Sequence, residues 1–319
     1  MKPEKILIVL LSFTTSLYLT GQTLEEREKQ IVKRNNIKTK IQYDYKYVNG
    51  KPSKKGRQAS ITWYSTGGEI LQKNYLNIKG EVSSWEKYEY DEKENRTLYK
   101  RESSNSKYRK ASKYNQENQA ILEAGYSGEE KFKTTYSYTA AGKPSKIIRY
   151  INNHIEEKLV YEHSGNTAIA SVYMGGKSPS SKIKLEYNIR GNIIEETVLS
   201  LDNRELEKKT FRYNSASQII EEEKTRDGSF YYRITYAYNV KGNLMKVSEE
   251  TLAKKEYIKK VYIFDTSNNL IKYKWRRNPS DEFNVKIYTY DSKGICLTEK
   301  TYYPKAKYRS MAKYQYTFY

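Results

Sequence analysis

Apolar and aromatic side chains alternate with polar ones along most of this chain. Aromatic residues stand two positions apart in pairs such as Tyr236 and Tyr238 or Tyr288 and Tyr290. Side chains two positions apart on a strand point to the same face of a sheet, so this spacing predicts strands with an aromatic face. Only residues 24–34 have helical spacing, and we expect a short helix there.

A turn signal follows these aromatic pairs and repeats with a regular period. Each copy has an aromatic residue, then Asn, Asp or a small polar residue, two variable residues, Gly or Asn, a polar residue, and Ile or Leu. From residue 90 onward, successive copies are 23 to 26 residues apart. Their aromatic residues are Tyr90, Tyr114, Tyr138, Tyr161, Tyr187, Tyr213, Tyr238, Phe264, Tyr290 and Tyr316. A second set of turn signals falls about midway between the copies, which predicts strands of about eight residues.

The turn chemistry of the repeat is specific. A type I turn favours Asn or Asp at its first position and Gly at its fourth, where the backbone can take positive φ. We therefore expect Gly191, Gly242 and Gly294 to occupy positive-φ turn positions and to close β-hairpins. Several copies lack this glycine, as at Ser217 and Asn268.

These signals predict an all-β fold, built as a tandem array of antiparallel β-hairpins over residues 41–319. Residues 22–40 would form a lead-in segment, which we expect to contain the short helix. No linker rich in Pro, Ser or Gly interrupts the array, so we expect one continuous meander rather than separate domains. We expect this sheet to be elongated or gently coiled, with a length on the order of 100 Å if it stays open.

The repeat resembles the YD-repeat family, the tyrosine-rich β-hairpin repeats of bacterial rearrangement-hotspot proteins and teneurins. The resemblance covers roughly residues 60–319 and is best at Tyr187, Tyr238 and Tyr290. It implies a hairpin array with a longer unit than is usual in that family. Large family members wind into hollow shells, but about ten copies are expected to be too few to enclose anything, so we carry over the fold and not the enclosing role.

The composition bears on whether the chain is folded and on what forms its core. Apolar residues are only 37% of the chain, charged residues are 30%, and the net charge is +20. Such values are typical of disordered chains. The 34 tyrosines indicate a folded protein instead, because tyrosine forms strands and offers a large apolar ring with a polar tip. We expect a thin core built from tyrosine rings.

The N-terminus has the order of a secretory signal peptide. A short charged start precedes an apolar stretch over residues 6–19 and a small-residue cleavage site before Gln22. We interpret residues 1–21 as a cleaved signal peptide. The alternative is a membrane anchor, but the apolar stretch is short for a bilayer, which takes ~20 residues. We expect an exported protein in the periplasm, at the cell surface or outside the cell, with Cys296 unpaired.

No catalytic, cofactor-binding or metal-binding constellation is visible, so we expect no enzyme activity and no cofactor. His154 and His163 lie in turn regions. Glu195 and Glu196 could supply paired acids for a glycoside hydrolase, but adjacent strand residues point to opposite faces. A glycoside hydrolase stays open as the weaker alternative.

The basic charge suggests binding of an anionic partner. Residues 51–57 and the segment 272–277 are the strongest basic clusters. We take the second cluster as the candidate ligand contacts, namely Lys272, Lys274, Trp275, Arg276 and Arg277. Its alternative interpretation is a soluble face whose charges block sheet aggregation. Nucleic acid is disfavoured as a partner, because the chain is expected to be exported.

The function expected from these features is a non-enzymatic binding or scaffold surface at the cell envelope, with a cell-surface protein or an anionic or glycan ligand as partner. A carbohydrate-binding module is the main alternative. An outer-membrane barrel would need an apolar band facing lipid, and segments such as residues 207–212 leave no such band.

Overall fold

A computed structural model describes residues 24–319; the expected signal peptide and its cleavage site lie outside the described residues. Helix α1 spans Leu24–Arg34, and no helix in the described part of the chain is long and apolar enough to cross a membrane. The strands are β1 (Ile37–Val48), β2 (Lys51–Pro52), β3 (Arg57–Tyr64), β4 (Ile70–Leu76), β5 (Val82–Tyr90), β6 (Arg96–Ser103), β7 (Ser106–Tyr114), β8 (Ala120–Ser127), β9 (Glu130–Tyr138), β10 (Pro144–Ile151), β11 (His154–Ser164), β12 (Thr167–Met174), β13 (Ser181–Tyr187), β14 (Ile193–Leu199), β15 (Glu205–Tyr213), β16 (Ile219–Arg226), β17 (Ser229–Tyr238), β18 (Leu244–Thr251), β19 (Lys254–Phe264), β20 (Leu270–Trp275), β21 (Asn284–Tyr290), β22 (Cys296–Tyr303) and β23 (Tyr308–Phe318).

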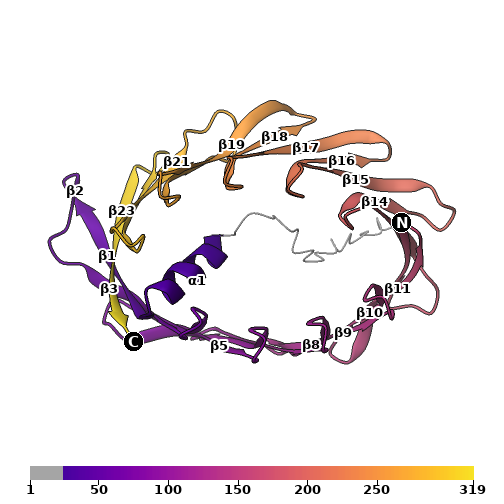
Figure 1. The fold of residues 1–319 in the computed structure, drawn as a ribbon, viewed down its shortest axis with the longest axis horizontal. Helices are drawn as coiled ribbons and strands as arrows, with labels where there is room; N and C mark the ends of the chain where they lie inside the picture. Colours follow the sequence, from indigo (N-terminus) through magenta and orange to yellow (C-terminus); the bar gives the residue numbers. More distant parts are fainter. Residues whose placement is uncertain (1–23) are drawn as a thin grey trace.

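The strands form a closed antiparallel barrel of 22 strands, with β2 as a short arm outside the ring (Figure 1). From β3 to β23, each strand pairs with its neighbours in sequence. The ring closes because β1 pairs with β3 on one side and with β23 on the other. The expectation of an open, elongated sheet is therefore wrong. So is the expectation that ten repeat copies cannot enclose anything, since α1 lies inside the ring.

Curvature of the sheet has a repeated local cause. A register shift occurs just before the repeat aromatic residue in successive copies, for example at Tyr90, Tyr114 and Tyr238. Such β-bulges bend a strand and increase its twist. Because a bulge recurs beside the repeat turns, the curvature accumulates in one direction and brings β23 back to β1.

The repeat turns have the geometry that their sequence predicts. Gly191, Gly242 and Gly294 have φ of 77°, 77° and 79°. Ser217 and Asn268, which replace the glycine, also have positive φ, at 58° and 71°. In the three turns that contain the glycine, the Asn or Asp oxygen accepts hydrogen bonds from the backbone N–H groups two and four residues later. The repeat turns lie at one end of the barrel, here called the repeat-turn rim.

Seven of the repeat tyrosines tie their hairpin to the previous one. Their hydroxyls donate to the carbonyl of the first residue of the preceding strand, with O···O distances of 2.6 to 3.2 Å. The donor and acceptor pairs are Tyr90 with Ile70, Tyr114 with Arg96, Tyr138 with Ala120, Tyr213 with Ile193, Tyr238 with Ile219, Tyr290 with Leu270, and Tyr316 with Cys296. A buried ring thus keeps its hydroxyl satisfied without a water molecule.

The two faces of the wall are identified by α1. Lys40 and Tyr64 contact α1 inside the ring, and Tyr288 and Tyr290 line a pocket against it. Cross-strand partners share a face, and neighbouring residues along a strand alternate between faces. The repeat tyrosines and the residues two positions before them therefore form the inner wall.

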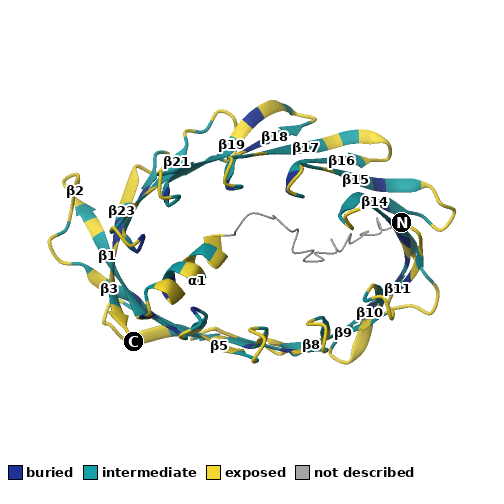
Figure 2. Cartoon of the chain, in the orientation of Figure 1, coloured by how far each residue is buried: buried dark blue, intermediate teal, exposed yellow. Residues whose placement is uncertain are grey.

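The core is thin and lies on this inner wall, and most of the wall is only partly buried (Figure 2). One tightly packed region lies across β10 to β14, where Leu159, Ala168 and Ala170 are almost fully buried. A second cluster joins Val32 of α1 to Tyr64 and to the turn that precedes β22. The barrel is thus a single layer whose inner face replaces a thick aliphatic core.

Replacing Gly191 by Val should lower the free energy of unfolding by about 1–2 kcal/mol, because an L side chain in the left-handed region is strained. No atom lies within 4 Å of the position that a Cβ would occupy, so the effect isolates backbone strain. Gly191→Asn is the matched control and should cost less, since Asn tolerates this region. Urea unfolding of the two variants measures the difference; equal stability of Gly191→Val and the unaltered protein would refute this account of the turn.

Tyr213→Phe should lower the free energy of unfolding by about 1 kcal/mol, because the carbonyl of Ile193 loses its donor at 2.6 Å. Tyr126→Phe is the control, since Tyr126 lies on the outer face and its hydroxyl has no partner within residues 24–319. Thermal and urea unfolding of both variants make the comparison. Equal effects at the two positions would mean that the repeat hydroxyl contributes nothing to stability.

Candidate functional site

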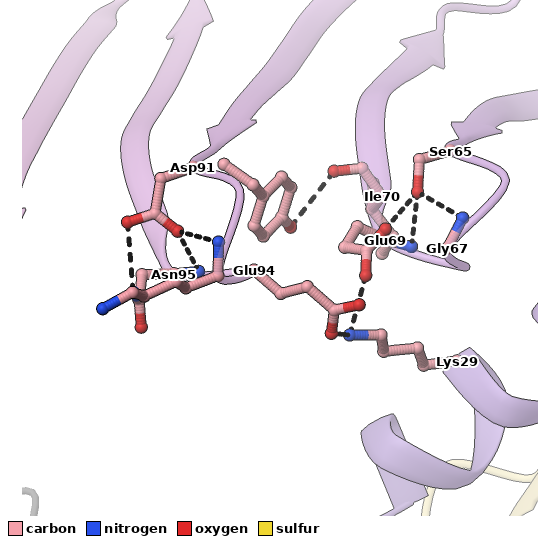
Figure 3. A network of polar contacts seen from close by, with 10 residues as sticks. Lys29, Ser65, Gly67, Glu69, Ile70, Asp91, Glu94 and Asn95 are labelled. Atoms are coloured by element: carbon pink, nitrogen blue, oxygen red, sulfur yellow. Dashed lines mark hydrogen bonds and ion pairs between the residues drawn. The ribbon is translucent and has the colours of Figure 1, made fainter. Parts of the chain in front are cut away.

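Helix α1 is held inside the barrel by charged contacts with the repeat-turn rim. The Lys29 ammonium lies 2.7 Å from the Glu69 carboxylate and 2.6 Å from that of Glu94, so that it bridges two neighbouring turns (Figure 3). At the other end of the helix, Arg34 donates to the carbonyl of Lys293 at 2.7 Å. The helix therefore contacts turns from both ends of the repeat array.

Glu28 of α1 connects the helix to the seam of the barrel, which is the place where β1 pairs with β3 and β23 and closes the ring. Its carboxylate lies 2.7 Å from the Lys40 ammonium of β1 and accepts a hydrogen bond from the Tyr64 hydroxyl of β3 at 3.2 Å. The side chain keeps 48% of its surface exposed, but that surface faces the barrel interior and a pocket of about 280 Å³. Desolvation there opposes ionisation, yet Lys40 and Tyr64 outweigh it and hold the pKa of Glu28 below its ordinary value.

Aromatic rings form two runs of successive contacts on the inner wall. Along β5 to β9, Tyr88, Tyr99, Tyr108 and Phe132 follow one another with centroid distances of 5.0, 5.6 and 5.8 Å. The second run lies on β19 to β23, on the other side of the ring (Figure 1). Its rings are Tyr262, Tyr273, Trp275, Tyr303 and Tyr308, with centroid distances of 4.8, 4.9, 5.8 and 6.1 Å. Two walls of the interior thus present extended aromatic surfaces.

Two carboxylates of the inner wall have cationic partners. Glu123 accepts from the Tyr136 hydroxyl at 3.1 Å and lies 2.7 Å from the Lys110 ammonium. The buried Glu157 lies 2.8 Å from Arg149. This interior is polar as well as aromatic, which suits a ligand with both apolar faces and hydroxyl groups.

Burial changes the acidity of the ring hydroxyls. It raises the pKa of Tyr213 and of Tyr238 to about 12. Burial likewise raises the pKa of the Cys296 thiol to about 11, so the thiol stays protonated at neutral pH. The Tyr213 and Tyr238 hydroxyls are hydrogen-bond donors to the carbonyls of Ile193 and Ile219.

The structure separates the residues of the basic cluster at 272–277. Lys272 and Lys274 lie on the outer face of β20, since the intervening Tyr273 faces the interior. Trp275 faces inward and belongs to the second aromatic run. Arg276 donates to the carbonyls of Ile258 and Pro279, and the carbonyl of Arg277 accepts from the Tyr257 hydroxyl. The cluster is therefore not one surface, and only Trp275 lies on the candidate inner-wall site.

The candidate acids and histidines are also spread apart. Glu195 pairs with Lys208 at 2.7 Å, and Glu196 pairs with Lys209 at 3.5 Å on the opposite face. His154 is the exposed first residue of β11, directly after a turn, and the His163 ring contacts the carbonyl of Pro144 at 2.7 Å. Among residues 24–319, no group of three His, Cys, Asp or Glu side chains could hold a metal ion.

Sequence reasoning missed the inner-wall run on β5 to β9 and the contacts of α1. The run had a signal, because Tyr88 and Tyr90 already show period-two spacing, but that spacing does not say which face lies inside. Helix α1 had acidic residues in its first turn and basic residues in its last. Such a pattern supports a helix. It does not identify the turns that Lys29 contacts, since these are far away in sequence.

No family model matches the chain, and no curated protein matches it. Among solved structures, a porin-like protein from Bacteroides uniformis is similar over 89% of this chain and 97% of its own, with 10% identity and a TM-score of 0.35. A porin-like protein from Bacteroides vulgatus is similar over 89% and 99%, with 8% identity and a TM-score of 0.26. A Photorhabdus luminescens Tc holotoxin pore is similar over 87% of this chain and 19% of its own, with 13% identity and a TM-score of 0.29. At such TM-scores, none of these likenesses assigns a function.

Acid should loosen the docking of α1. Because the pKa of Glu28 is lowered in the folded protein, its stabilising contribution is present above the ordinary value of 4.5 and is lost as the pH falls through the folded value. Hydrogen exchange of residues 24–34, compared between neutral pH and pH below the folded value and corrected for the intrinsic exchange rate at each pH, should show lower protection factors in acid. Glu28→Gln should reduce this pH dependence, and an unchanged dependence in that variant would contradict the assignment to Glu28.

Proposed function

We propose that this chain is an exported, non-enzymatic binding protein of the cell envelope, and that its binding surface is the inner wall of the barrel. The observation that carries the proposal is the pair of aromatic runs on opposite walls. Aromatic rings give large contact area with little loss of conformational freedom. A closed wall holds those rings in fixed positions before a ligand arrives, which lowers the entropy lost on binding.

The charged side chains of the outer wall support an outer surface that is in contact with water, like the inner surface. Arg233 lies between Glu223 and Glu250, at 2.5 and 3.3 Å, on the outer face of three neighbouring strands. Lys184 and Glu186 form a further outer pair on β13. A lipid-facing wall would need an apolar band at these positions. The charged outer wall therefore supports location in an aqueous compartment of the envelope.

A carbohydrate-binding module is the second candidate, and one feature favours it. The inner wall combines aromatic plates with carboxylates such as Glu123 and Glu299, which can accept hydrogen bonds from sugar hydroxyls. A glycoside hydrolase has no comparable support, because Glu195 and Glu196 point to opposite faces. The resemblance of the turns to YD repeats remains a proposal about ancestry. It gives no information about the identity of the ligand.

The test is a pull-down of the mature protein against cell-envelope extract at low and high salt. Tyr99→Leu removes a central ring of the first run and should weaken capture about fivefold or more, the equivalent of ~1 kcal/mol. Tyr173→Leu is the matched control, since Tyr173 is an outer-wall tyrosine with a lysine over its ring. Equal loss with both variants, or no retained ligand at either salt concentration, would reject the inner wall as the binding surface.

A further inference from the structure

A large groove lies at the barrel rim opposite the repeat turns. Its volume is about 1610 Å³, and it lies between the projecting end of β1, the segment that follows β2, and strands β21 to β23. Its floor includes Gln42, Asp44 and Thr301 from the inner wall. The groove therefore begins inside the barrel, where Glu299 lines both the groove and the pocket beside α1, and it opens at the rim.

The charges of this groove are unbalanced. Both of its carboxylates are already paired, Glu299 with Lys286 at 2.6 Å and Asp44 with Arg57 at 3.6 Å. Four further cations line the groove, are exposed, and have no carboxylate partner within residues 24–319. These are Lys46, Lys55, Lys307 and Arg309. An incoming anion would meet four unpaired positive charges.

Aromatic rings continue from the inner wall into the groove. The second run ends at Tyr303 and Tyr308, and both residues line the groove. Tyr302 also lines it and lies beneath the Arg309 guanidinium, at 5.0 Å from the ring centroid. Five successive rings therefore lead from the interior at Tyr262 to the rim, and such a track fits a long ligand with a repeated flat face.

We infer that this groove binds an acidic polysaccharide, a chain of sugar units that carry carboxylates. This inference rests on the proposed binding function, and it adds the place of entry and the chemistry of the ligand. Apolar sugar faces would lie on the tyrosine rings, and the sugar carboxylates would pair with Lys307, Arg309, Lys46 and Lys55. The sugar hydroxyls would donate to Asp44 and Glu299.

The two carboxylates decide between a polysaccharide and a nucleic acid. A phosphodiester backbone carries a negative charge at every unit and no hydroxyl hydrogen on its phosphates, so it offers no hydrogen-bond donor to Asp44 and Glu299. A polysaccharide has hydroxyl donors for these carboxylates and separate carboxylates for the cations. The mixed lining therefore matches a ligand with both groups.

The binding of oligogalacturonate to the mature protein tests the inference, with an uncharged cello-oligosaccharide of equal length and a single-stranded DNA as comparison probes. The double variant Lys307→Ala/Arg309→Ala should weaken oligogalacturonate binding about tenfold, because two charge-assisted contacts are lost. It should also reduce the salt dependence of binding, since surface charges act through screened attraction.

The control is the double variant Lys143→Ala/Lys177→Ala, which removes the same charge at exposed turns outside the groove. It should bind oligogalacturonate as the unaltered protein does. Equal weakening in the two double variants, absence of oligogalacturonate binding, or tighter binding of DNA would each overturn the inference. Capture from envelope extract that depends on Tyr99 but not on Lys307 and Arg309 would leave the proposed function standing and reject the groove.

Discussion

The pairing of β1 with β23 is the constraint on which the rest of this structure depends. It joins residues 37–46 to residues 310–318 and leaves the ring without a free edge. Exposed strand edges are templates for aggregation, and closure removes them. Closure also creates an inside, because only a closed wall can face its tyrosines toward a shared interior. Helix α1 reinforces the closure, since Glu28 contacts both β1 and β3.

Tyrosine allows a wall one layer thick to be both stable and polar. The ring packs against neighbouring strands, while the hydroxyl donates to a carbonyl or a carboxylate on the same wall. An aliphatic side chain would supply the packing but no hydrogen bond. A chain with only 37% apolar residues can thus fold without a conventional core, and its inner surface remains able to meet a hydrated ligand.

The strands and turns could be predicted from the sequence because their causes are local. Period-two tyrosines and an Asn or Asp three residues before Gly191, Gly242 or Gly294 act within a single hairpin. Closure could not be predicted in this way, because β1 lacks the repeat signature and its partner lies near the other end of the chain. The groove was missed for the same reason, since β1 and β21 to β23 meet only after closure. Strand alternation explains why the basic cluster separated, with Trp275 inside and Lys274 outside.

The closed ring changes the way in which the protein should unfold. Open repeat arrays unfold by fraying from their terminal units, whose outer sides lack a neighbour. Here the first and last strands protect each other, and α1 lies across that junction. Unfolding must therefore begin at the seam. Many backbone hydrogen bonds must break together there before any hairpin can separate from its neighbours. The barrel should consequently behave as one cooperative body despite being built from small, similar parts.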